Sequence, residues 1–188
     1  DNGYGEKAME CFEQMKVEDI DPDSLTYIHF LKACGSLGAK QRGEEIHDEI
    51  ERQGLLQGNL GIANVLVDMY AKCGLLVRAQ QVFDKFLTRD IVSWNALIAG
   101  YVEHGQGEEA MECFEQMKQD GVSPDVVTLV CVLKSCASIG AAAKGQEIHV
   151  ELERQGLLET DLFVGSTLVD MYAKCGLLRK AEQLFEKL

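Results

Sequence analysis

Two histidines occupy matching positions in the chain, and each is close to glutamates that could act with it in acid–base or metal chemistry. His47 and His149 both follow Glu-Ile and precede glutamates two and four residues further on. A zinc hydrolase helix of this kind has a second histidine four residues from the first, with a glutamate between them. Neither histidine has such a partner, and the two are 102 residues apart. The sequence therefore favours structural or surface histidines over a catalytic or metal site.

The seven cysteines are spread singly along the chain, and no Cys-X-X-Cys pair occurs. Cys131 and Cys136 are five residues apart on one expected helix, which is unsuitable spacing for zinc. Six cysteines, including Cys11, lie in apolar helical patterns, where a reduced cysteine behaves as a small hydrophobe. The sequence also lacks a glycine-rich phosphate loop and a nucleophile–base arrangement. We predict no enzymatic activity, no metal, no cofactor and a reducing compartment.

The composition is that of a folded helical protein. Hydrophobic residues make up 46% of the chain, and its two prolines are Pro22 and Pro124, so long helices meet few breakers. No apolar run reaches the eighteen or so residues of a membrane span, and we expect no membrane partner. The opening residues resemble neither a signal peptide nor a transit peptide, so we expect any targeting segment to lie outside this sequence.

The net charge of −13 at first sight opposes a nucleic-acid partner, because phosphates are neutralised by Lys and Arg. The face that carries each charge matters more than the total, however. A repeat protein can be acidic on its outer surface and neutral or basic on its inner surface.

An internal repeat of 102 residues runs through the chain. Residues 8–16 return as 110–118, and Leu66–Leu76 returns nearly unchanged as Leu168–Leu178, at the same offset and without a gap. More than half of the comparable positions are identical. Such self-similarity indicates a repeat architecture.

The period is too long for one structural unit and divides into three helical hairpins. Ala110, Phe114 and Met117 recur at i, i+4 and i+7, which is one face of a helix. Glycines such as Gly74 and Gly176 separate helices of this type from earlier apolar helices. The division predicts eleven helices in hairpins of about 31 to 36 residues. A hairpin of this size cannot bury its own apolar face, so we predict an all-α fold, an α-solenoid superhelix with a concave surface.

The hairpins resemble pentatricopeptide repeats of the form whose motifs alternate in three lengths, called P, L and S. Residues 91–125, which begin Ile-Val-Ser-Trp-Asn-Ala-Leu-Ile, resemble a P motif. Residues 126–161 contain Gly-Gln-Glu-Ile-His and resemble an L motif, and residues 60–90 contain Leu-Val-Asp-Met-Tyr-Ala-Lys-Cys-Gly and resemble an S motif. The same division gives a partial P motif at 1–23, an L motif at 24–59 and a truncated S motif at 162–188.

The resemblance implies sequence-specific binding of single-stranded RNA, about one base per repeat. In the family, the fifth residue of a motif and its last residue select the base together. Short polar side chains suit this role because they can hydrogen-bond the edge of an unpaired base. Carried over, the pairs are Asn64 with Asp90, Asn95 with Asp125, Ile28 with Asn59 and Val130 with Asp161, while Ser166 and Asp23 belong to incomplete pairs.

The base preferences follow from the same resemblance. Asn with Asp favours uracil in the family, so residues 60–90 and 91–125 resemble a reader of two successive uracils. Ser166 is of the type that usually goes with purines. Ile28 and Val130 have no hydrogen bond to offer, so we expect little base reading by the L motifs.

Two further motif positions complete the expected site. The second residue of a motif helps to sandwich the base, whereas the thirteenth residue faces phosphate. Lys72 and Lys174 occupy the thirteenth position of the S motifs, but the P motif has Glu103 there, and Gly61 has no side chain to pack on a base. We therefore expect weak RNA affinity from this chain alone. The other sandwiching residues are Leu25, Val92, Val127 and Phe163.

Several of these residues also fit simpler roles. Asp90 and Asp125 are suitable N-cap residues for the helices that follow them, which is compatible with base contact. Lys72 and Lys174 are ordinary surface lysines in the absence of a ligand. We expect Trp94 to pack between hairpins instead of forming a stacking platform.

Arrays of P, L and S motifs usually guide organellar C-to-U RNA editing, with the deaminase in a separate C-terminal domain. The zinc signature of that deaminase is not in this sequence. We therefore expect the target-recognition part of a plastid or mitochondrial editing factor. The alternative is a protein-interaction scaffold that docks small organellar editing factors through its L motifs and binds RNA weakly. A third hypothesis is self-association through apolar faces at the truncated ends, such as Phe12 with Met15 and Leu184 with Phe185.

Overall fold

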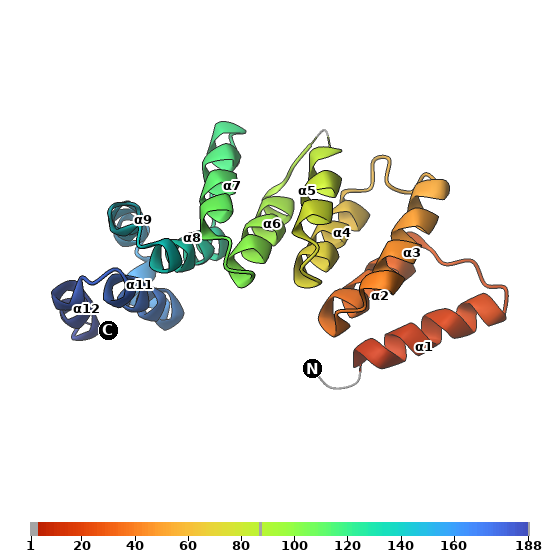
Figure 1. The fold of residues 1–188 in the computed structure, drawn as a ribbon, viewed down its shortest axis with the longest axis horizontal. Coiled ribbons are helices and arrows are strands. Elements are labelled where there is room, and N and C mark those ends of the chain that lie inside the picture. Colours follow the sequence, from red (N-terminus) through yellow and green to blue (C-terminus); the bar gives the residue numbers. More distant parts are fainter. Residues whose placement is uncertain (1–3, 87, 188) are drawn as a thin grey trace. The chain divides into compact units, whose positions relative to one another are not determined.

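The computed structural model describes residues 4–86 and 88–187, and all regular elements in these residues are helices (Figure 1). The outermost residues of the first and last predicted motifs, 1–3 and 188, lie outside the described part. The chain divides into two compact units, Asp1–Gly100 and Tyr101–Leu188. A search of the described residues for a helix of bilayer-spanning length and hydropathy finds no candidate.

Each predicted hairpin consists of a first helix and a second helix, and the first unit holds three helices of each kind. The eleven predicted helices are all present among the described residues of the two units. The structure adds α10, a single turn that follows α9 in the second unit. The first unit contains α1 (Tyr4–Val17), α2 (Ser24–Leu37), α3 (Lys40–Arg52), α4 (Leu60–Lys72), α5 (Leu76–Asp84) and most of α6 (Ile91–Glu103). The second contains α7 (Gly107–Gln119), α8 (Val126–Ile139), α9 (Ala142–Arg154), α10 (Leu157–Thr160), α11 (Leu162–Lys174) and α12 (Leu178–Phe185).

In the first unit, the first helices form the centre of the packing. Helix α2 contacts α1, α3 and α4, and α4 also contacts α3 and α5. Phe12 of α1 lies against Phe30 of α2 with ring centroids 4.2 Å apart. Trp94 of α6 is 2% exposed and meets Phe83 of α5 edge-on at 4.5 Å. The prediction that Trp94 packs between hairpins is confirmed.

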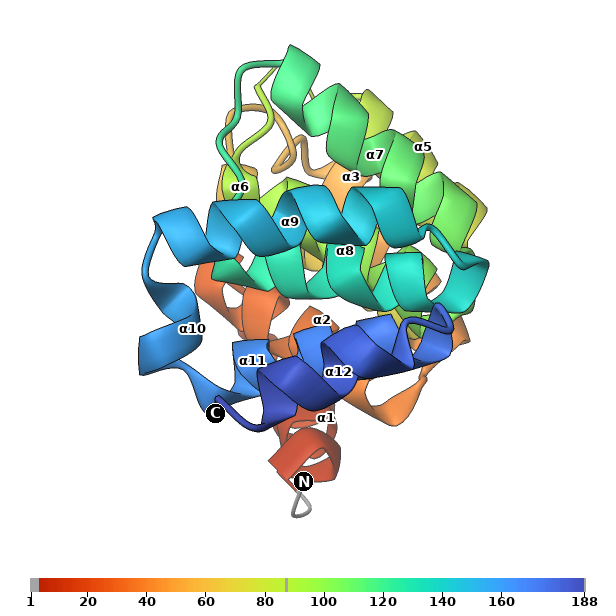
Figure 2. The same cartoon turned by 90° about the vertical axis from the view of Figure 1, so that its left-hand side faces the viewer.

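The second unit repeats this arrangement (Figure 2). Helix α8 contacts α7, α9 and α11, and α11 contacts α9, α10 and α12. Leu133, Leu168 and Met171 are completely buried in its core. Each apolar face therefore closes against a neighbouring hairpin, as expected for units too small to bury their own.

Ion pairs join consecutive second helices. In the first unit they run from α1 to α3 and from α3 to α5, and in the second from α7 to α9. Exposed pairs of this kind contribute about 0–1 kcal/mol each. The apolar contacts around the first helices therefore provide most of the stability. The pairs are Lys16–Glu49 (2.8 Å), Lys85–Glu51 (2.7 Å) and Lys144–Glu115 (2.7 Å).

Two predictions about exposure are wrong. Cys11 is exposed, because it lies on the face of α1 that turns away from the apolar contacts of Phe12. Phe12 and Leu184, expected to form open apolar faces, are 2% and 7% exposed. Phe12 is covered by the aromatic side chains of α2. Phe185 does remain largely exposed.

We predict that Gly100→Ala destabilises the first unit. A methyl group at Gly100 of α6 would lie 2.5 Å from the Cβ of Ala71 on α4. Helix propensity alone would make this substitution favourable by about 1 kcal/mol. We expect overpacking to outweigh that gain and to cost about 1–3 kcal/mol, measured by urea unfolding. Adding Ala71→Gly should restore part of the loss, whereas an unchanged midpoint in Gly100→Ala would contradict the close approach.

Candidate RNA-binding surface

The last residue of each predicted motif caps the first helix of the next. Its side-chain oxygen accepts a hydrogen bond from a backbone N–H in the first turn, which satisfies a donor that has no partner within the helix. The prediction that Asp90 and Asp125 are N-cap residues is confirmed. The bonds are Asp23 from Thr26 (2.8 Å), Asn59 from Ile62 (3.2 Å), Asp90 from Ser93 (2.9 Å), Asp125 from Thr128 (2.9 Å) and Asp161 from Phe163 (2.9 Å).

The structure brings Asn64 and Asp90 together. The amide Nδ2 of Asn64, on α4, donates to both carboxylate oxygens of Asp90, each at 3.1 Å. Both side chains are half-buried. The amide oxygen Oδ1 of Asn64 is buried and has no hydrogen-bond partner. Asp90, the N-cap residue of α6, thus also fixes the orientation of the Asn64 amide. In this orientation the amide oxygen of Asn64 remains available as an acceptor.

Hydrogen bonds hold Asp90 in its charged form. Its partial burial would raise the pKa of the carboxyl group, but the bonds from the Ser93 backbone and the Asn64 side chain outweigh that effect. The pKa of Asp90 is therefore below its ordinary value. An ionised Asp90 can only accept hydrogen bonds, which determines that the amide nitrogen of Asn64 faces it.

Asn95 lies in the first unit and Asp125 lies in the second. Asn95 is half-buried on α6, one turn after the start of that helix. Asp125 precedes α8 in a capping box, because its own backbone N–H donates to the Thr128 hydroxyl at 3.2 Å. Asp125 is also half-buried.

The predicted L-motif pairs are less suited to contact a base. Ile28 is half-buried, and a methyl group at Gly61 would touch both its Cδ1 (3.4 Å) and the Oδ1 of Asn59 (3.3 Å), so these three residues lie together. Val130 is 6% exposed and forms part of the core of the second unit. This burial fits the expectation that the L motifs read bases little, because an apolar side chain at this position gains more by packing in the core than by facing a ligand.

The single members of incomplete pairs are both exposed. Asp23 accepts from the Thr26 hydroxyl and backbone, and these bonds lower the pKa of its carboxyl group. Ser166, on α11, donates to the backbone oxygen of Phe163 at 3.0 Å. Its hydroxyl group can still accept a hydrogen bond from a ligand.

Exposed apolar side chains recur at the second residue of the first helices. Each follows the N-cap by two positions, so the cap fixes its place at the start of the helix. Gly61 occupies this position on α4 and is exposed without a side chain to offer. Aliphatic side chains at this position can pack against the face of a base, and the ring of Phe163 can stack on one. The exposed fractions are 59% for Leu25, 55% for Val92, 54% for Val127 and 58% for Phe163.

Lys72 and Lys174 are exposed, but each already has an acidic partner. The ammonium group of Lys72 lies 2.7 Å from Asp68, and that of Lys174 lies 2.8 Å from Asp170. Both aspartates are four residues earlier on the same helix. The lysines are therefore positioned as predicted for surface residues, whereas their aspartate partners were not predicted.

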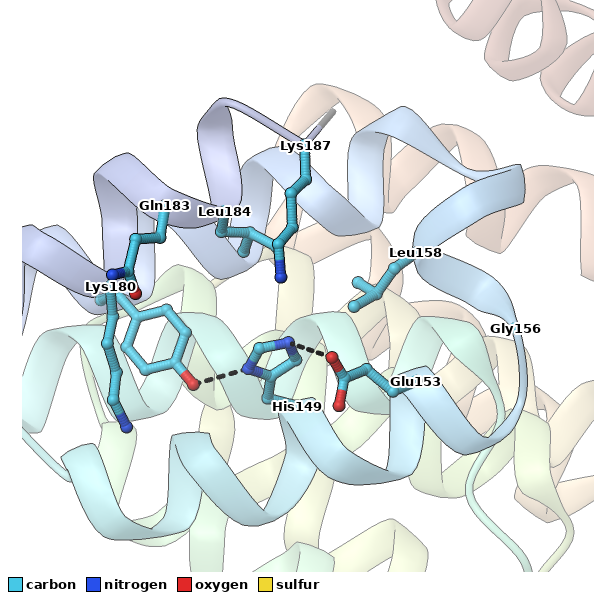
Figure 3. A pocket seen from close by; sticks show the side chains of 9 residues that line it. His149, Glu153, Gly156, Leu158, Lys180, Gln183, Leu184 and Lys187 are labelled. Carbon is cyan, nitrogen blue, oxygen red and sulfur yellow. Dashed lines mark hydrogen bonds and ion pairs between the residues drawn. The ribbon is translucent and has the colours of Figure 1, made fainter.

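The two histidines have structural roles, as predicted. The Nδ1 atom of His47 lies 2.8 Å from the Tyr70 hydroxyl, and that of His149 lies 2.7 Å from the Tyr172 hydroxyl. With the hydroxyl donating, Nε2 carries the ring proton and faces a glutamate carboxylate at 3.4 Å in both cases. Figure 3 shows His149 between these groups. The residues lie in a cavity of about 540 Å³ that Lys180 and Lys187 also line. No three acidic, histidine or cysteine side chains within the described residues are placed to hold a metal ion.

Two further contacts were not predicted. Lys134 of α8 places its ammonium group 5.6 Å from the ring centre of Phe163, within the range of a cation–π interaction. The histidine–tyrosine bonds link a second helix to the next first helix. The i, i+4 spacing of Asp68 with Lys72 was visible in the sequence, whereas contacts between helices require the packing to be known.

Known proteins resemble the chain over its whole length. Models of pentatricopeptide repeats match residues 10–73, 62–91, 89–138 and 166–188. A mitochondrial pentatricopeptide repeat-containing protein of Arabidopsis thaliana is 36% identical over 100% of the chain and 18% of its own length. A chloroplastic one from the same plant is 38% identical over 99% of the chain and 34% of its own length. The chain thus spans about a fifth of the first of these relatives and about a third of the second.

A solved structure supports the same conclusion about the fold. The maize pentatricopeptide repeat protein PPR10, in complex with an 18-nt psaJ RNA element, superposes with a TM-score of 0.78 at 21% identity. The superposition covers 98% of this chain and 27% of that one. The fold is therefore an α-solenoid of helical hairpins. The chain belongs to the pentatricopeptide repeat family.

We predict that mild acid destabilises the fold through the two bonded histidines. Burial lowers the pKa of His47 and of His149, so protonation opposes folding. Their contribution is complete above the unfolded pKa of about 6.5 and decreases as the pH falls below it. The melting temperature should fall between pH 7.5 and 5.5, and His47→Gln/His149→Gln should show a smaller fall. An equal fall in both proteins would contradict this assignment. Carboxylates whose pKa is lowered, such as Asp90, affect the stability only at lower pH.

Proposed function

We propose that the chain is a non-catalytic module that binds single-stranded RNA and reads about one base per repeat. The observation that carries this proposal is the pairing of Asn64 with Asp90 beside exposed apolar side chains at the helix starts. A fixed polar group with adjacent stacking surfaces is the combination that recognises unpaired bases. The RNA bound by PPR10 in its solved complex gives further support, because this chain has the same fold.

We propose that the Asn64–Asp90 pair reads uracil, the base that an Asn–Asp pair favours in the family. The buried Oδ1 of Asn64 lacks a donor, and an unsatisfied buried acceptor costs about 1–3 kcal/mol. The imino N–H of uracil is a donor of the required kind, and the entering base has to displace the atoms that cover the amide oxygen. Asn95 is the corresponding residue of the next motif, so we propose that these two motifs read adjacent uracils.

We further propose that the chain is a P, L and S array from an organellar C-to-U editing factor. The starts of the first helices support the motif division, because Ser24, Leu60, Ile91, Val126 and Leu162 each begin a proposed motif and a helix. The mitochondrial and chloroplastic names of the relatives support an organellar location. The bases read by Asn64 and Asn95 would then form part of the sequence beside the edited cytidine.

A protein-interaction scaffold is the second candidate. The burial of Val130 and the apolar character of Ile28 favour it, because the L motifs then offer no polar group to a base. The net charge of −13 also opposes a strong electrostatic attraction to RNA. In this alternative, small organellar editing factors dock on the L motifs and the RNA affinity depends on them.

Binding of labelled ten-nucleotide RNAs tests the first proposal. We predict that an RNA with two adjacent uracils in a purine background binds better than the same RNA with two adenines there. The variant Asn64→Ala/Asn95→Ala should lose this preference, which we expect to be about 5- to 150-fold if polar reading contributes about 1–3 kcal/mol. Fluorescence anisotropy measures each affinity.

The matched control is Gln116→Ala. Gln116 also donates its amide to an aspartate, Asp120, but does so on the second helix α7. This variant should keep the preference of the unaltered protein. Base-blind binding by the unaltered protein, or an unchanged preference in the double variant, would instead support the scaffold.

A further inference from the structure

The same ion pair occurs on both first helices of the proposed S motifs. On α4, Lys72 lies 2.7 Å from Asp68, and on α11, Lys174 lies 2.8 Å from Asp170. The side chains are between 31% and 59% exposed, so both pairs are open to solvent and to a ligand. The pair is therefore a repeated feature of the two units and not a single surface contact.

The paired aspartate lies between the position that selects the base and the lysine. Asn64, Asp68 and Lys72 follow one another at four-residue steps, which places them along one face of α4 about 6 Å apart in rise. On α11, Ser166 begins the equivalent series. A strand that contacts Asn64 with a base and Lys72 with a phosphate consequently passes over Asp68.

The stem of Lys72 is held beside the neighbouring first helix. A methyl group at Gly35 of α2 would lie 3.4 Å from its Cδ and 3.7 Å from its Cβ. Gly35 is buried, so this part of Lys72 packs in the layer formed by α2 and α4. The ammonium group at the end of the stem can bind either Asp68 or another anion.

We propose that Asp68 and Asp170 compete with RNA phosphate for Lys72 and Lys174, and so limit the RNA affinity of the two S motifs. This inference rests on the proposed RNA binding. Each pair has a net charge of zero, so its lysine gives little long-range attraction to a phosphate. Two unit charges about 6 Å apart in water change a binding constant by about threefold, and salt reduces the effect.

A purely structural role is the competing explanation. Aspartate and lysine four residues apart stabilise an exposed helix slightly, and such a pair need not affect a ligand. The two explanations differ in the salt dependence of RNA binding. If the aspartate holds the lysine in an ion pair, replacing the aspartate frees the ammonium group to neutralise a phosphate. The RNA affinity then depends more steeply on the salt concentration.

The experiment compares Asp68→Asn/Asp170→Asn with the unaltered protein, using the uracil-containing ten-nucleotide RNA between 50 and 200 mM NaCl. We expect about tenfold tighter binding at 50 mM, from about threefold at each pair. The slope of log affinity against log salt should steepen by up to about 0.7 for each freed lysine. Adding Lys72→Gln and Lys174→Gln to this variant should abolish both gains. Thermal unfolding verifies that each variant is folded.

A matched control removes two carboxylates from other helices. Glu108→Gln/Glu151→Gln changes the net charge by the same amount, on α7 and α9, where both glutamates are second-helix residues. Equal gains in this control and in Asp68→Asn/Asp170→Asn would overturn the proposal, as would no gain in the latter. RNA binding by the unaltered protein with no gain in the aspartate variant rejects this inference alone. Absence of RNA binding by every variant rejects the proposed function together with it.

Discussion

Close approach between neighbouring first helices is the constraint on which the rest of the structure depends. In the first unit, Gly100 of α6 faces Ala71 of α4, and Gly35 of α2 faces the backbone of Met69 on α4. Small residues at these points allow the apolar faces to close against one another, which a single hairpin cannot do for itself. The same approach places the starts of successive first helices side by side within that unit. A repeated surface, instead of a single pocket, is the consequence.

The residues that end each motif connect this packing to recognition. A carboxylate or amide is needed before each first helix to cap its N–H groups, and the cap restricts where that side chain can lie. Asp90 accepts from the backbone of Ser93 and also from the amide of Asn64. The geometry of the Asn64–Asp90 pair is therefore maintained by the helix that follows it. A substitution at Asp90 would therefore change helix stability and the proposed base contact together, whereas Asn64→Ala leaves the bond from Ser93 to Asp90 in place.

Much of the fold could be predicted from the sequence because the helices follow local rules. Helical periodicity and glycine breaks gave eleven helices, and the N-cap roles of Asp90 and Asp125 followed from residue type and position. Burial was less predictable: Val130 is in the core and Cys11 is exposed, although both lie in apolar patterns. Which face of a helix is covered depends on the neighbouring helices. The contact of Lys134 with Phe163 and the extra turn α10 likewise arise from packing between elements far apart in sequence or from loop closure.

Charge is arranged differently in the two sets of helices, and this explains how an acidic chain can be compatible with an RNA ligand. Much of the acidic surface is on second helices, where pairs such as Lys85 with Glu51 bridge adjacent hairpins. On α4 and α11 the lysines pair within their own helix instead. A bridging pair links two hairpins, whereas a pair within one helix can be exchanged for a phosphate without changing any contact between helices. Under the proposed RNA binding, the first helices are therefore where a change of one carboxylate would alter RNA affinity without altering the fold.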